Sequence, residues 1–177
     1  MSRLGMPARL DSDDAAVLCE LLHAEEAHYR RLLRLAWRQT SYLRRQDVPR
    51  LEINAEQWTK YLPRADTARV KREAYLSELA VKLDLNDDSL APQLLLDRAD
   101  IEQKKRIDAA VERLLEVANK LNRQNELNRQ LADFCLELAH EESEIFKQGV
   151  LEDPSGCYED DACKTTAAPG KVFIRQA

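Results

Sequence analysis

Apolar residues recur every third or fourth position from Asp100 to Gln148, and no glycine or proline interrupts this stretch. That spacing places the apolar side chains along one face of an α-helix. At about 1.5 Å per residue, the helix would be roughly 70 Å long. A helix of this length buries its apolar face most readily against other long helices, so the stretch predicts a helical bundle.

The rest of the chain is compatible with the same fold class. A first helix is expected from about residue 12 to residue 46, because its apolar stripe has a heptad rhythm. Pro49 fits the first turn of a second helix, Pro63 is expected to interrupt that helix, and a short helix is expected at residues 90–98. Strand patterns and hairpin turns are nearly absent. We therefore predict an all-α fold, an elongated antiparallel helical bundle or coiled coil with long first and last helices. The stripe of the first helix is Leu18, Leu22, Glu25, Tyr29, Leu32, Ala36, Gln39 and Leu43.

Three segments are predicted along the chain. Residues 1–11 are expected to form a flexible tail, residues 12–150 a helical bundle domain and residues 151–177 a disordered tail. Gly149 and Pro154 are expected to end the last helix. Cys157 and Cys163 have no second Cys or His pair near them, so we predict no zinc site in the tail.

Composition argues against several classes of function. The net charge of −5 gives no electrostatic support for nucleic-acid binding. No stretch has the ~18 uninterrupted apolar residues of a transmembrane helix, and the first residues lack a signal-peptide core, so a cytosolic protein without stable membrane insertion is expected. The sequence has no glycine-rich phosphate loop, no G-x-S-x-G and no H-E-x-x-H. We therefore predict no catalytic residues and no cofactor.

All three histidines occur in the motif E-x-x-H, at Glu20–His23, Glu25–His28 and Glu137–His140. In a four-helix bundle this motif can mark a di-iron carboxylate site. However, Glu137 and His140 lie about 200° and 140° round the helix from the apolar position Cys135. Only Glu25 lies on an apolar seam. A ferritin-like di-iron enzyme is therefore the least favoured alternative, and we predict no metal site.

Two asparagines interrupt the apolar seam of the last helix. Steps of four and three from Ile107 reach Val111, Leu114, Ala118, Leu121, Asn125, Asn128, Ala132, Cys135, Ala139, Glu142 and Phe146. A bulkier stripe runs beside the seam at Leu127, Leu131, Phe134, Leu138 and Ile145. A polar seam residue specifies register or partner at a cost in stability. Either the asparagines bond inside the bundle, to Glu25 or Gln39, or they mark where a partner's amphipathic helix docks.

Three segments follow one another in an order and spacing that are typical of one protein family. They are "LLHAEEAHYRRLLRLAWRQTSYLRRQD" in the first helix, "REAYLSELAVKLDL" at residues 72–85 and "LNRQNELNRQL" at residues 121–131. Together they resemble the FlgN-type flagellar export chaperones over about residues 15–148. Asp84 departs from the family pattern, because a glycine is usual at its place, so the helix end there is expected to differ.

The resemblance implies a cytosolic chaperone without catalysis. It would bind flagellar hook–filament junction proteins before type III export, and pass them to the export gate and ATPase-associated components. In such families the C-terminal helix receives an amphipathic segment near the substrate's C-terminus. That implies partner-binding residues at Asn125, Asn128, Leu131, Ala132, Cys135, Leu138 and Glu142. The alternative is a structural coiled-coil or adaptor protein that self-associates through the last helix.

Overall fold

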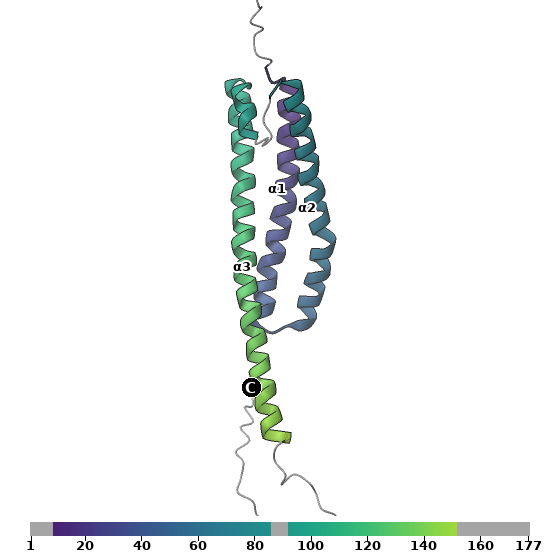
Figure 1. Ribbon diagram of the computed structural model, residues 1–177, viewed down its shortest axis with the longest axis vertical. Coiled ribbons are helices and arrows are strands. Elements are labelled where there is room, and N and C mark those ends of the chain that lie inside the picture. The colour runs from purple at the N-terminus through teal and green to yellow at the C-terminus, as the bar shows by residue number, and fades with distance from the viewer. Residues whose placement is uncertain (1–8, 86–91, 152–177) are drawn as a thin grey trace, which may run out of the picture. The chain divides into compact units, whose positions relative to one another are not determined.

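The chain is mainly α-helical in the parts that the structure describes. In the computed structural model these parts are residues 9–85 and 92–151 (Figure 1). They contain three long α-helices and one short 3-10 helix: α1 at Ser12–Arg44, α2 at Val48–Lys82, η1 at Pro92–Asp97 and α3 at Ile101–Leu151. No strand occurs among these residues, so the all-α prediction is confirmed.

The helices belong to two compact units. The first unit extends to Asp133 and holds α1, α2, η1 and most of α3, whereas the second begins at Phe134 and holds the end of α3. All the buried core residues lie in the first unit.

Neighbouring helices α1 and α2 run antiparallel, and the part of α3 in the first unit runs parallel to α1 (Figure 1). Near the start of α1, Asp14 pairs with Lys82 at the end of α2. Near the end of α1, the carbonyl of Leu35 accepts a hydrogen bond from Asn54, close to the start of α2. The predicted antiparallel pairing is therefore found for the first two helices.

Two clusters of buried apolar side chains form the core of the first unit. The larger cluster joins the three long helices and η1, and its most deeply buried large residues are Leu18, Leu22, Leu76, Leu79, Leu95 and Ile107. The smaller cluster lies further along α1 and consists of Leu32, Leu33, Leu35, Ala36, Ala65 and Leu121. Every residue of the predicted α1 stripe is buried or half-buried, so the heptad interpretation of this helix is confirmed.

The predicted interruption at Pro63 is wrong, because α2 continues through this residue without a break. Proline has no N–H, so the carbonyl of Thr59 loses its helical donor. Pro63 and Thr59 are both exposed, and water can therefore hydrate that carbonyl. Ala65 and Ala68 are buried directly after the proline, so packing supports the helix on its far side. Figure 1 shows the resulting bow in α2.

Both α1 and α2 end in a Schellman motif whose left-handed residue is not glycine. At the end of α2 the N–H of Leu85 donates to Ala80 over 2.9 Å, and the φ of Asp84 is 55°. Gln46 occupies the same place after α1, with a φ of 52°. Asp84 thus keeps the backbone form that a glycine would favour, contrary to the expectation that this helix end differs.

We expect Asp84→Gly and Gln46→Gly each to raise the free energy of unfolding by about 0.5–1 kcal/mol. Glycine adopts positive φ without the steric cost of a Cβ, and part of that gain is offset by its greater freedom in the unfolded chain. Urea unfolding followed by circular dichroism measures the change. Arg45→Gly is the matched control, because the φ of Arg45 is −99° and glycine there gains nothing. A Gln46→Gly protein no more stable than the Arg45→Gly protein would contradict the strain assigned to this motif.

The remaining helix boundaries differ from the sequence predictions in detail. The short helix expected at residues 90–98 is the 3-10 helix η1 over its described part. A reciprocal capping box starts α3: the N–H of Gln103 donates to Asp100 over 2.7 Å, and the N–H of Asp100 donates back to Gln103 over 2.9 Å. Gly149 does not end α3, which continues to Leu151.

The ends of the chain are described only in part. Residues 1–8 and 152–177, which include most of both predicted tails and the pair Cys157 and Cys163, lie outside the described residues. Leu10, assigned from the sequence to the first tail, is buried, and its N–H donates to the carbonyl of Arg98 over 2.9 Å. Among the described helices, none is long and apolar enough to cross a membrane.

Candidate functional site

The buried glutamate of the E-x-x-H motifs takes part in an ion pair between helices. Glu25 is only 2% exposed, and its carboxylate lies 2.6 Å from Nε of Arg72 on α2. Burial, followed by the nearby Glu25 carboxylate, raises the pKa of Tyr29 one turn further along α1. The polar seam position that the sequence showed at Glu25 is thus matched by a cation from the neighbouring helix.

The other E-x-x-H residues are exposed, except for the half-buried His28. Glu137 and His140 are exposed, as their helical directions predicted, and so is Glu20. His23 is exposed as well, and its ring lies 2.7 Å from the guanidinium of Arg113. Within residues 9–85 and 92–151, no three His, Cys, Asp or Glu side chains form a group that could hold a metal ion.

Asn128 is bound inside the bundle by a network of hydrogen bonds. It is 3% exposed, and its Nδ2 donates to the carbonyl of Ala36 over 2.8 Å and to Oε1 of Gln39 over 3.1 Å. Its Oδ1 accepts from the hydroxyl of Thr40 over 2.5 Å and from Gln124 over 3.3 Å. The prediction that this asparagine forms hydrogen bonds inside the bundle is therefore confirmed, and its partner is Gln39 rather than Glu25.

Asn125 does not lie in the seam, and this part of the sequence interpretation is wrong. The side chain of Asn125 is exposed, whereas that of Gln124 is half-buried and donates to Thr40 over 2.8 Å. The seam therefore steps from Leu121 to Gln124 to Asn128, three residues and then four. Steps counted along α3 alone could not show this, because the residue toward which Gln124 turns, Thr40, belongs to α1.

The other predicted partner-binding residues follow Asn128 along α3. Leu131 and Ala132, in the first unit, are half-buried. Cys135 and Leu138, in the second unit, are also half-buried, and Glu142 is exposed. The structure thus places the seven residues in three different environments: a buried polar layer, a half-buried strip and an exposed surface.

The described helix of the second unit has a wide apolar face. At about 100° per residue, Phe134, Leu138 and Ile145 fall within about 40° of one another, and Cys135 and Phe146 lie within about 120° of Phe134. Several of these side chains are uncovered: Phe134 is 60% exposed, Ile145 69% and Phe146 65%. We call this surface, made of Phe134, Cys135, Leu138, Ala139, Ile145 and Phe146, the α3 apolar face.

The opposite side of the same helix is mainly polar, with Glu137, His140, Glu144 and Lys147, and it also carries the exposed Leu136. The site prediction omitted Phe134, Ile145 and Phe146, although their size and spacing were visible in the sequence. It followed the small seam residues instead, and so it missed the side chains with the most uncovered apolar area. An amphipathic helix with its apolar side uncovered is suited to pairing with another amphipathic helix.

A family model described as "FlgN protein" matches residues 6–165, which is most of the chain. The chain belongs to the FlgN family. FlgN proteins are flagellar export chaperones, a class that binds flagellar substrate proteins. No curated protein and no solved structure matches the chain significantly.

Proposed function

We propose that this FlgN protein is a cytosolic chaperone whose α3 apolar face holds the C-terminal amphipathic segment of a hook–filament junction protein before type III export. One observation carries the proposal: large apolar side chains of an amphipathic helix stay uncovered in the second unit. An uncovered apolar surface of this kind is typical of a protein-interaction site. Pairing with a substrate helix would remove it from water and would keep the substrate helix from premature assembly.

Glu142 gives the α3 apolar face a polar centre. Its position lies about 80° from Phe134, between Leu138 and Cys135 on the helix surface. A carboxylate covered by a purely apolar partner would lose its hydration without compensation. We therefore propose that the bound segment offers Glu142 a cation or a hydroxyl, and that this requirement discriminates among substrates and keeps binding reversible.

Four of the predicted partner-binding residues belong to the first unit and are considered separately. Leu131, Ala132 and Asn125 remain candidate contacts, because they are half-buried or exposed. Asn128 is not among them, since its amide is already bonded within the bundle. From family membership we also propose delivery of the substrate to the export gate and to ATPase-associated components.

Phe134→Ala with Phe146→Ala is expected to weaken binding of the junction-protein C-terminal segment by about 100-fold. Each phenylalanine buried in an interface contributes roughly 1.5–3 kcal/mol, and central aromatic anchors dominate helix pairing. Isothermal titration calorimetry with the full-length chaperone and each junction protein measures the change. Because both side chains are exposed in the free chain, its thermal stability should stay within about 0.5 kcal/mol of the unmodified protein.

Leu136→Ala provides the matched control. Leu136 is 70% exposed, but it lies about 200° from Phe134 and therefore off the α3 apolar face. Its substitution should leave binding unchanged. Equal losses in both proteins, or no loss in either, would exclude this face as the substrate site.

Self-association is the second candidate, because the same uncovered face could pair with a second copy of the chain. Sedimentation velocity distinguishes the two. A dimer that the double phenylalanine variant abolishes, together with no binding of any junction protein, would favour the structural coiled-coil alternative.

A further inference from the structure

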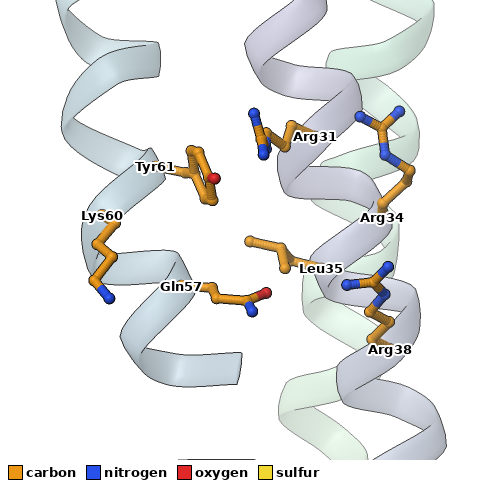
Figure 2. Close-up of a pocket in the computed structure, with 7 residues that line it drawn as sticks. All are labelled: Arg31, Arg34, Leu35, Arg38, Gln57, Lys60 and Tyr61. Carbon is orange, nitrogen blue, oxygen red and sulfur yellow. The ribbon is translucent and has the colours of Figure 1, made fainter. Parts of the chain in front are cut away.

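A cationic pocket lies between α1 and α2 in the first unit. Its volume is about 420 Å³, and four of its lining side chains are cations: Arg31, Arg34, Arg38 and Lys60. None of the seven lining residues is acidic. Figure 2 shows Leu35 and Gln57 directed toward each other across the gap, with Arg31 and Tyr61 facing each other one turn away. A concentrated positive site is unexpected in a chain whose net charge is −5.

These four cations have no carboxylate partner among the described residues. The cations found in ion pairs there are Arg30, Arg50, Arg69, Arg72, Lys82, Arg113, Lys120, Arg129 and Lys147. Some cations on the same two helices are matched by acids one turn away, as Arg69 is by Asp66 and Glu73, whereas Arg64 and Lys71 make no ion pair among the described residues. The pocket therefore combines like charges that repel one another unless an anion is supplied from outside.

The pocket continues into a second one along the same helices. The second pocket has a volume of about 240 Å³, shares Arg38 and Gln57 with the first, and adds Tyr42 and Arg50. From Arg31 to Tyr42 the combined surface follows α1 for about 16 Å. We call the two pockets together the α1–α2 groove.

Aromatic rings hold some of the guanidinium groups in place. The guanidinium of Arg31 lies 3.9 Å from the ring centre of Tyr61, and that of Arg64 lies 5.2 Å from the same ring. Stacking on a ring fixes the orientation of the planar guanidinium, so its N–H groups are preorganised for a bidentate bond to a carboxylate. The half-buried rings of Tyr42 and Tyr61 add apolar area on which a peptide side chain can pack, whereas Leu35 beneath them is buried.

We propose that the α1–α2 groove binds an acidic peptide segment of a partner protein. The cations are distributed over two helices and along about 16 Å, which matches several carboxylates on one segment better than the single centre of a phosphate ion. The apolar and aromatic surface between them suits a polypeptide. This inference is independent of the proposed function, because it uses neither α3 nor its apolar face.

The test measures binding of a fluorescein-labelled peptide to the full-length protein by fluorescence anisotropy. The peptide alternates glutamate with leucine and alanine and has about twelve residues, roughly 18 Å as a helix. A peptide with glutamine in place of every glutamate is the charge control. We expect the glutamate peptide to bind at least tenfold more tightly, and its binding to weaken when salt rises from about 50 to about 500 mM.

The variant Arg34→Gln with Arg38→Gln should weaken this binding about tenfold, because two charge-assisted contacts are lost. Lys105→Gln with Arg123→Gln is the matched control, since both residues are exposed cations on α3 with the same total charge. Equal weakening by the two variants, or equal binding of the two peptides, would overturn the proposal. Tighter binding of inorganic phosphate or of an oligothymidylate, lost in the groove variant, would also overturn it in favour of that ligand.

The chain's own tail contains Glu159, Asp160 and Asp161 and is a competing occupant. Glu159→Gln with Asp160→Asn and Asp161→Asn in the full chain separates the two sources. Unchanged affinity for the peptide supports an external partner. A tenfold gain in affinity would assign the groove to the tail and overturn the proposal.

Discussion

Arg72→Met is expected to lower the free energy of unfolding by about 3–5 kcal/mol. The substitution keeps much of the apolar stem of Arg72 but leaves the carboxylate of Glu25, which is 2% exposed, without its cation. A buried charge without a partner has lost its hydration and gains no compensating attraction. Urea unfolding followed by circular dichroism measures the loss.

Arg69→Met is the control on the same helix. Arg69 makes ion pairs with Asp66 and Glu73, but all three side chains are more than one-third exposed. Solvent screens such pairs, so the expected loss is below about 1 kcal/mol. The double variant Glu25→Leu with Arg72→Leu should recover most of the stability, because both charges are gone and leucines suit the surrounding core. If Arg72→Met costs no more than Arg69→Met, Glu25 is not held in the way the structure indicates.

Asn128→Leu is expected to lower the free energy of unfolding by about 2–3 kcal/mol, although it places a leucine in an apolar seam. The substitution removes the donor to the Ala36 carbonyl and to Gln39, and the acceptor of the Thr40 hydroxyl. Each hydrogen bond lost from a buried amide costs about 1 kcal/mol, and the sum outweighs the gain from burying a leucine at a site shaped for an amide. Thermal and urea unfolding should agree in direction.

Asn125→Leu is the matched control, one turn before Asn128 and exposed. Its effect on stability should lie within about 0.5 kcal/mol. Should Asn128→Leu instead stabilise the free protein, the hydrogen bonds around the amide would contribute less than an apolar seam, and the polar layer would have to be explained by partner binding.

The fold class was predictable because it depends on local spacing. The α1 stripe, the helix start near residue 100 and the Pro49 helix start all follow from interactions within one or two turns. Pro63 was predicted wrongly because the local cost of a proline was weighed without the packing of Ala65 and Ala68 that follows it. The helix end at Asp84 was misjudged for a related reason, since aspartate can adopt the left-handed conformation at a modest cost.

The candidate site was predicted only in part. Spacing indicated the region after Leu121 as the place where the seam changes character, and Glu25 and Gln39 as polar seam residues of the first helix. Steps counted along one helix could not show that Gln124, rather than Asn125, turns toward Thr40. They also could not pair Glu25 with Arg72, because these residues are far apart in the chain and lie on different helices.

The sequence by itself determined that the chain forms long amphipathic helices, and its motif order indicated the FlgN family, which the family match then confirmed. Hydrophobic periodicity and family motifs are properties of the linear sequence, so they can be recognised without knowing which helices lie next to one another. Only the tertiary structure decided which polar seam residues are satisfied from within. In that structure Asn128 of "LNRQNELNRQL" is hydrogen-bonded inside the bundle, whereas Phe134, Ile145 and Phe146 are exposed. The physical reason is that desolvation and hydrogen bonding depend on what another helix places opposite a residue, and that is set by the fold as a whole.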